Sequence, residues 1–361
     1  MTRFAPRCRP ILIGSLPLND HSQAMDLIFE YTPGFPLWPQ LPKHAREGMV
    51  RQFLTGMPGL TDEDKRFWID NGRDGFEAEM AAFYEDYLTA VEDDDFLDSS
   101  RFALGMDTAA GFFALQDAIP LRPQKPQGLK GQITGPISTG IGVVDHQGRN
   151  IIFDDNLRDM MVKLLSLKAR WQVNRLKALQ CGHPPMLFID EPGIVSFGSS
   201  AYIAITREMV TESLREVISS IQLAGGLAGI HICANGDFSL ALESGVDIIS
   251  FDAYAYFENF TLYRAALKAF IAGGGVLAWG IVPTLDPEAV DRETAEQLYK
   301  KWTQQLAELT SLGIPEADLL EQTLIASACG AGTLSVERAH KVLGMVRDVS
   351  TGIRGKFSLA D

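Results

Sequence analysis

From about residue 128 onward the sequence alternates short apolar runs with longer amphipathic segments, and this rhythm restricts the fold more than any other feature. The short runs contain few polar residues, which is typical of parallel strands buried on both faces of a sheet. The longer segments repeat apolar residues at helical spacing, as at Leu157, Met160, Met161 and Leu164. The sequence predicts strands at 11–13, 128–138, 186–190, 227–231, 247–252, 276–280 and 324–329, and helices at 156–181, 204–223, 237–243, 261–272, 287–312 and 335–349.

We expect these elements to form an α/β fold, a (β/α)8 TIM barrel. An eighth strand is expected near 102–106, which would complete the barrel. The main rival is a doubly wound open sheet. The three glycines at 273–275 do not favour that rival, because they follow a helix and precede a strand, the reverse of the order in a dinucleotide-binding fingerprint.

The length of 361 residues suits one large barrel, so residues 1–361 are expected to form a single domain. Residues 32–95 are expected to be a loop and helical insertion that forms part of the active-site wall. Residues 32–60 are rich in proline and glycine, as in long functional loops. Residues 62–91 are expected to be helical, and the acidic run at 92–95 to be a solvated surface.

Charge and hydropathy exclude several classes of partner. A formal net charge of −14 disfavours binding to nucleic acid or to an anionic membrane surface. The sequence contains no apolar run of about 18 residues and no signal-peptide pattern near its start, so we expect a cytoplasmic protein. Four cysteines in a chain of this length do not indicate a disulfide framework.

Residue types that bind metals or transfer protons occupy the carboxyl ends of four predicted strands. In a barrel these ends meet on one face, where active sites are built. Residues i and i+2 of an extended segment point to the same side, so one imidazole and one thiolate would face the same point. Sulfur and nitrogen ligands favour zinc, although a core histidine beside a buried free cysteine is the alternative explanation. The residues are Asp190, Glu191, His231, Cys233, Asp252 and Cys329.

Five strings in the sequence also resemble a known superfamily, in the same order and over about residues 11–340. This superfamily joins cobalamin-independent methionine synthase, methylcobalamin:coenzyme M methyltransferases and uroporphyrinogen decarboxylase. The resemblance implies a (β/α)8 barrel and, in the two methyltransferase branches, a catalytic zinc. The strings are IGSLP (13–17), GQITGPIS (131–138), IDEP (189–192), HICANGD (231–237) and CGAG (329–332).

The resemblance also implies roles for individual residues. His231, Cys233 and Cys329 match the zinc ligands, and Asp252 stands where methionine synthase has a glutamate ligand. Asp190 matches the carboxylate that holds the amine of homocysteine, beside Glu191 as a further substrate-binding candidate. Ser15 matches a serine near the homocysteine carboxylate. A second amine-binding glutamate of that family corresponds to a position near Lys43 here. Because a cation then replaces an anion, Lys43 favours a thiol substrate with an acidic group over homocysteine. Asp190 and Asp252 are the catalytic candidates.

The expected function is zinc-dependent transfer of a methyl group to homocysteine or another small thiol. The donor would be a methylcorrinoid, carried by a partner corrinoid protein, or methyltetrahydrofolate. The folate-using synthases of the family have an additional N-terminal barrel half that this chain lacks, which favours a methylcobalamin-type donor. The alternatives are a lyase similar to uroporphyrinogen decarboxylase, and a non-catalytic barrel that binds a small molecule or corrinoid.

Overall fold

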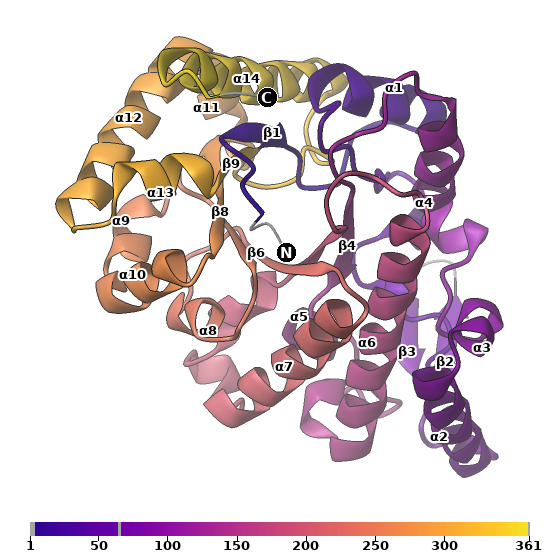
Figure 1. The fold of residues 1–361 in the computed structure, drawn as a ribbon. Helices are drawn as coiled ribbons and strands as arrows, with labels where there is room; N and C mark the ends of the chain where they lie inside the picture. The colour runs from indigo at the N-terminus through magenta and orange to yellow at the C-terminus, as the bar shows by residue number, and fades with distance from the viewer. Residues whose placement is uncertain (1–3, 64–65, 360–361) are drawn as a thin grey trace.

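A computed structural model describes residues 4–63 and 66–359. Its main feature is a curled sheet of seven parallel strands in the order β1-β9-β8-β7-β6-β5-β4 (Figure 1). The first strand pairs with the last, so the sheet curves back toward its own beginning. The strands are β1 (Arg9–Ile11), β4 (Lys130–Thr134), β5 (Met186–Asp190), β6 (Leu227–Ile232), β7 (Ile248–Phe251), β8 (Val276–Val282) and β9 (Thr323–Ser327).

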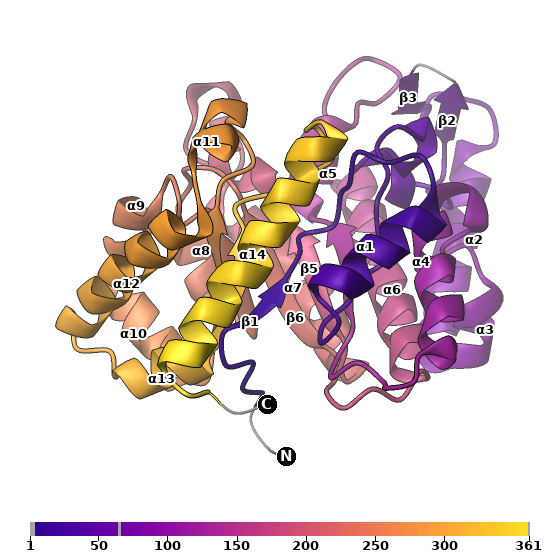
Figure 2. The ribbon, with the colours of Figure 1, turned by 90° about the horizontal axis from the view of Figure 1, so that it is seen from above.

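Helices surround the outside of this sheet (Figure 1), as expected for an α/β protein. In Figure 2 the two termini lie at one end of the molecule, opposite α11 and the strands β2 and β3. None of the helices in the described part of the chain is long and apolar enough to cross a membrane. The helices are α1 (His21–Tyr31), α2 (Phe76–Glu92), α3 (Asp94–Ser99), α4 (Met106–Ala118), α5 (Pro136–Gly142), α6 (Asp155–Lys177), α7 (Arg207–Leu223), α8 (Ser239–Leu242), α9 (Phe257–Thr261), α10 (Arg264–Ala272), α11 (Pro287–Arg292), α12 (Ala295–Ser311), α13 (Glu316–Glu321) and α14 (Val336–Lys356).

The sheet separates two hydrophobic cores. The larger core fills the space between the sheet and the helices, whereas a smaller core lies on the inner, concave face of the sheet. Phe188, Ile248 and Leu324 belong to the inner core, and their neighbours along each strand belong to the outer one. Because both faces are covered, most of the strands are predominantly apolar, which explains why the sequence indicated them clearly. The exception is β4, whose sequence KGQIT includes the buried Lys130 and Gln132.

The edges of the sheet, β1 and β4, are connected by an irregular segment rather than by an eighth strand. Leu37 forms a parallel bridge with Lys130 of β4, and Gln40 forms one with Ser15, just after β1. The Lys130 ammonium group also reaches across the gap and donates a hydrogen bond to the carbonyl oxygen of Ile13. The gap is therefore spanned by a short stretch of backbone and by one fully buried lysine, which the sequence did not indicate as important.

The strand expected at 102–106 was a wrong prediction. These residues form a turn that leads into α4, which begins at Met106. The carbonyl oxygens of Arg101 and Ala103 accept hydrogen bonds from the buried Lys168 ammonium group, 3.4 and 3.2 Å away, instead of from a neighbouring strand. Phe102 is buried in the larger hydrophobic core although it lies in a turn, so the apolar character of this segment did not indicate a strand.

The segment 32–95 agrees with the prediction only in part. Residues 32–60 are irregular apart from two short 3-10 helices, η1 (Ala45–Glu47) and η2 (Arg51–Phe53), as expected for a loop region. The helix expected over 62–91 is in fact the antiparallel hairpin of β2 (Leu60–Glu63) and β3 (Arg66–Ile69), followed by α2.

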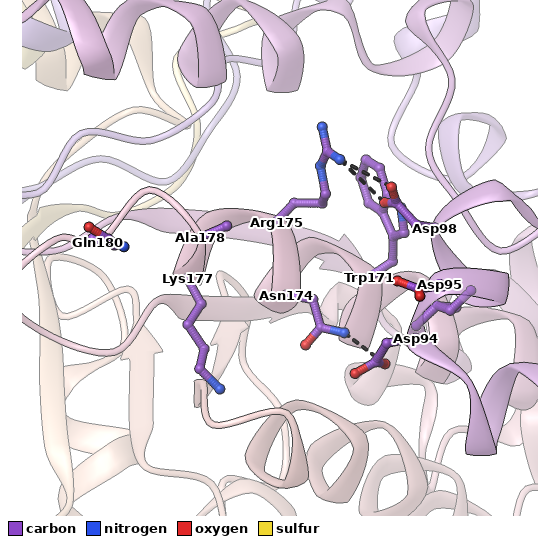
Figure 3. Close-up of a pocket in the computed structure, with 10 residues that line it drawn as sticks. Asp94, Asp95, Asp98, Trp171, Asn174, Arg175, Lys177, Ala178 and Gln180 are labelled. Carbon is purple, nitrogen blue, oxygen red and sulfur yellow. Dashed lines mark hydrogen bonds and ion pairs between the residues drawn. The ribbon is translucent and has the colours of Figure 1, made fainter.

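The acidic run at 92–95 lies on the surface, and some of its carboxylates attach α3 to α6 (Figure 3). Asp94 accepts hydrogen bonds from Arg170 and Asn174 at 2.7 and 3.0 Å. Asp98, one turn later, accepts one from the Trp171 indole at 2.9 Å. These hydrogen bonds give part of this acidic segment a structural role, the attachment of α3 to α6.

Candidate metal centre

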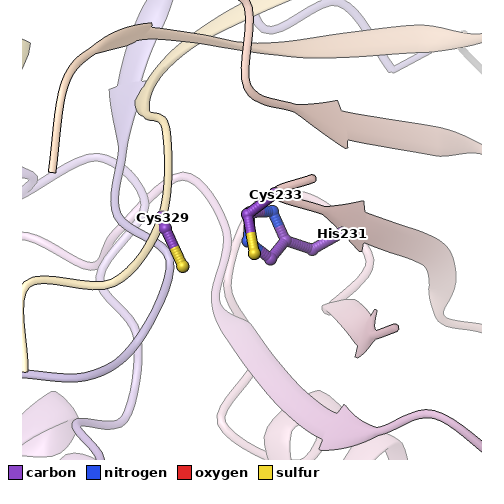
Figure 4. Close-up of side chains that lie close together, drawn as sticks. All are labelled: His231, Cys233 and Cys329. Atoms are coloured by element: carbon purple, nitrogen blue, oxygen red, sulfur yellow. The ribbon is translucent and has the colours of Figure 1, made fainter. Parts of the chain in front are cut away.

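Three potential metal ligands converge at the carboxyl ends of the strands. His231 lies in β6, Cys233 follows it, and Cys329 follows β9. One nitrogen and two sulfur atoms from these side chains all lie within 4.8 Å of one another (Figure 4). Two strands separate β6 from β9 in the sheet, so only the curl of the sheet brings these residues together.

One nitrogen of the His231 ring contacts a neighbouring hydroxyl group, and the other has no hydrogen-bond partner among the described residues. Its Nδ1 lies 2.9 Å from the Ser250 hydroxyl oxygen on β7. Its Nε2 is buried and has no hydrogen-bond partner among the described residues. A buried polar atom without a hydrogen-bond partner is costly, and coordination of a metal ion would compensate for this cost. With the ring hydrogen on Nδ1, the Nε2 lone pair is available to a metal ion.

The contact between the two thiols shifts their pKa values in opposite directions. A hydrogen bond from the Cys329 thiol holds the pKa of Cys233 well below its usual range, and His231 acts in the same direction against the effect of burial. The same contact raises the pKa of Cys329. Cys233 is therefore ready to serve as a thiolate, the form in which cysteine binds metals.

This donor set fits zinc. Two sulfurs and one imidazole nitrogen are typical ligands of a catalytic zinc, which keeps its fourth position for water or substrate. Zn–S bonds are about 2.3 Å long, so two of them span about 4.6 Å at most. The observed separations, within 4.8 Å, allow one ion to contact all three atoms after a small movement of the side chains.

The three side chains line a cavity of about 200 Å³. One wall comes from the loop after residue 40, and the other comes from the strand ends that the sequence had singled out. Part of the 32–95 segment thus lines this cavity, and its role as a wall of an active site stays a prediction. The lining residues are Ile13, Ser15, Gln40, Pro42, Glu47, Met49, Asp190, Pro192, His231, Cys233, Cys329 and Gly330.

Asp190 contributes a carboxylate to this cavity. The residue is 7% exposed, and its Oδ1 is buried without a hydrogen-bond partner among the described residues. Burial raises the pKa of Asp190 to about 6, and the nearby Lys130 opposes that shift. An unpartnered acceptor of this kind is suited to a cationic group of a substrate.

Ser15 also lines the cavity, and its role in substrate binding stays a prediction. Its hydroxyl oxygen accepts a hydrogen bond from the Gly332 amide at 3.2 Å. A Cβ atom at Gly330 would lie 2.1 Å from the same oxygen. The glycines after Cys329 therefore allow this segment to approach Ser15 closely.

Asp252 is buried but does not join the three-residue cluster or line the cavity. Its Oδ1 accepts a hydrogen bond from the Ala255 amide at 2.8 Å and stabilises the turn after β7. The structure thus gives Asp252 a role in backbone conformation, and its role as a zinc ligand or catalytic residue stays a prediction.

Glu191 does not line the cavity. Its carboxylate accepts hydrogen bonds from the Ile137 and Ser138 amides, at 2.9 and 2.6 Å, and from the Ser138 hydroxyl. The Ser138 oxygen in turn accepts a hydrogen bond from the Gly193 amide at 2.7 Å. The structure thus gives Glu191 a structural role that connects the strings IDEP and GQITGPIS, and its role in substrate binding stays a prediction.

Lys43 is exposed and does not line the cavity, so its role in substrate binding stays a prediction. The acidic residue Glu47 from the same loop is buried and lines the cavity instead. Its carboxylate accepts from the Leu41 amide at 3.0 Å and lies 2.8 Å from the His21 ring. Sequence reasoning missed Glu47, whose only signal was its place four residues after Lys43.

Comparisons with known proteins add little to this geometry. No family model matches the sequence, and no curated protein matches it. One solved structure, described as an uncharacterized protein, is similar with a TM-score of 0.31 and 13% identity, over 67% of this chain and 61% of that chain. The chain thus spans less than two thirds of the length of that protein, and so low a similarity does not assign a function.

Proposed function

We propose that this protein is a zinc-dependent methyltransferase that transfers a methyl group to the sulfur of a small thiol. The observation that supports this proposal is the convergence of His231, Cys233 and Cys329 on a cavity that also contains the unpartnered Asp190 oxygen. When bound, zinc would keep a coordinated thiol deprotonated and nucleophilic near neutral pH. A metal position and a substrate anchor in one small cavity are what such a reaction requires.

We also infer that the fold is a (β/α)8 barrel in which an irregular segment takes the place of one strand. Residues 37–40 connect the two edges of the seven-stranded sheet through bridges to Lys130 and Ser15. In such a barrel the carboxyl ends of the strands form the active-site face. The metal ligands occupy these ends.

The charges of the cavity favour a thiol that carries an amine. Asp190 and Glu47 contribute two carboxylates, whereas none of the described lining residues is a lysine or arginine. A cationic amine would pair with the free Asp190 oxygen while the sulfur approaches the ligands on the neighbouring strands. This preference replaces the acidic thiol that Lys43 had favoured, because Lys43 lies outside the cavity.

The size of the cavity favours a methyl donor that stays at the mouth of the cavity. A volume of about 200 Å³ accommodates a small thiol but not a corrinoid or a folate in addition. The donor, either a methylcorrinoid on a partner protein or methyltetrahydrofolate, would therefore present its methyl group from outside. Nothing in the cavity chooses between these two donors. A lyase acting on a tetrapyrrole with several carboxylates is less well supported, because the described lining contains no lysine or arginine.

The test uses zinc-loaded protein with methylcobalamin or methyltetrahydrofolate as donor. The acceptors are homocysteine, which has an amine, and coenzyme M and mercaptopropionate, which do not. We expect demethylation with the amine-bearing thiol, and we expect Asp190→Asn to raise its KM by about 10- to 100-fold, the loss of one charged hydrogen bond. Glu212→Gln, on the exposed face of α7, is the control and should behave like wild type. Failure of both donors with every thiol would contradict the proposed activity and favour a binding protein.

A further inference from the structure

We propose that Ser250 is a positioning residue for the metal centre, because it holds His231 in the tautomer and orientation that metal binding requires. This inference rests on the metal site of the proposed function but not on methyl transfer. Ser250 lies outside the cavity, and no motif in the sequence singled it out. Ser250 contacts His231, which in turn would bind the metal ion.

The position of Ser250 follows from the pairing of β6 with β7. In the parallel register of these strands, Ser250 is the direct partner of His231. Partner residues of neighbouring strands direct their side chains to the same face of a sheet. The hydroxyl oxygen of Ser250 therefore lies beside the ring, 2.9 Å from Nδ1.

This contact accommodates the form of the imidazole that a metal ion requires. A neutral imidazole carries one N–H, and either nitrogen can hold it. When Nδ1 carries the hydrogen and donates it to the Ser250 oxygen, Nε2 keeps a bare lone pair directed at Cys233 and Cys329. Metal-bound histidines usually donate their second ring N–H to an oxygen acceptor such as a carboxylate, a backbone carbonyl or water, which fixes both the tautomer and the ring plane. Here the Ser250 hydroxyl oxygen lies at the position of that acceptor.

On the β8 side of Ser250 no side chain can replace its hydroxyl group, whereas the partner of His231 on its other side, on β5, is Asp190. The partner of Ser250 on β8 is Ala278, which has no polar side-chain atom. The remainder of β7 reads Ile248, Ile249 and Phe251, so Ser250 is its only polar residue. A hydroxyl in a fully buried strand costs free energy unless it makes a hydrogen bond, and the bond to His231 accounts for its presence here.

The experiment compares Ser250→Thr with Ser250→Val, two variants of nearly equal shape that differ in the hydroxyl group. Zinc affinity is measured by competition with a chromogenic chelator, and the site is also loaded with Co²⁺, whose visible absorption reports ligand geometry. We expect Ser250→Val to bind zinc about 10- to 100-fold more weakly and to alter the cobalt spectrum, and Ser250→Thr to remain close to wild type.

Ser350→Ala is the matched control. Ser350, on α14, is also buried, but its hydroxyl group donates a hydrogen bond to the Cys8 carbonyl oxygen at 2.7 Å. This variant should lose some stability and keep its zinc affinity. Equal zinc affinities and cobalt spectra for the Val and Thr variants would overturn the proposal, and so would a wild-type protein that binds neither ion. Normal metal binding without methyl transfer would contradict the proposed function and leave the role of Ser250 supported.

Discussion

Replacing Glu191 by alanine should destabilise the protein by about 3–5 kcal/mol. The Glu191 carboxylate is fully buried and accepts hydrogen bonds from the Ile137 amide, the Ser138 amide and the Ser138 hydroxyl. Alanine leaves these donors without an acceptor, and each unpaired buried donor costs about 1–3 kcal/mol. The estimate is near the lower half of the sum because water can enter the space that the side chain vacates.

Glu191→Gln keeps the shape of the side chain but removes its titratable carboxyl group, so it tests the effect of ionisation on stability. Burial raises the pKa of Glu191 to about 7, so the native state binds this proton more tightly than the unfolded state does. The resulting contribution to stability is fully present below the unfolded pKa of about 4.3 and is lost as the pH rises through about 7. The stability difference between wild type and the glutamine variant should therefore shrink between pH 5 and pH 8.

The assay is urea unfolding followed by circular dichroism, with the free energies compared at a common slope. Glu212→Ala, an exposed glutamate on α7, is the control and should change stability by less than about 0.5 kcal/mol. If Glu191→Ala were as stable as this control, the hydrogen bonds to α5 would not support the fold and our explanation of the IDEP string would be refuted.

Three further substitutions test other parts of the structure. Gly330→Ala places a Cβ atom 2.1 Å from the Ser15 hydroxyl oxygen, so the segment after Cys329 must move, and we expect a lower zinc content by atomic absorption. Lys168→Met should make the free energy of unfolding less dependent on pH. Burial lowers the pKa of Lys168 to about 7, so its contribution to stability is lost as the pH falls from about 10.4 toward 7. Unfolding of wild type and variant at pH 7 and pH 10 measures this change. Thr294→Ala removes the capping box at the start of α12 and should cost about 1 kcal/mol in thermal unfolding.

The strands were predictable because burial on both faces makes most of them predominantly apolar. The prediction for β5 agrees with the structure at both ends, and β7 differs by one residue at each end. Helix boundaries were harder to predict where caps interrupt an amphipathic pattern. The segment expected as one helix over 287–312 is divided by Thr294 into α11 and α12.

The site was predictable only where strand ends carry its residues. His231, Cys233 and Cys329 follow apolar runs, so their convergence could be inferred from the expected barrel. Glu47 and Lys130 could not, because their roles depend on contacts between distant segments. Glu47 lies 2.8 Å from His21, 26 positions away, and Lys130 donates to Ile13, 117 positions away.

Direct measurement of zinc in the purified protein tests the central claim. Freshly prepared wild type should contain about one zinc per chain, since three convergent ligands define a single site. Cys233→Ser and Cys329→Ser should lose it, whereas Cys181→Ser, a cysteine outside the cluster, should keep it. Wild type without zinc, or full zinc retention by both cluster variants, would contradict the claim.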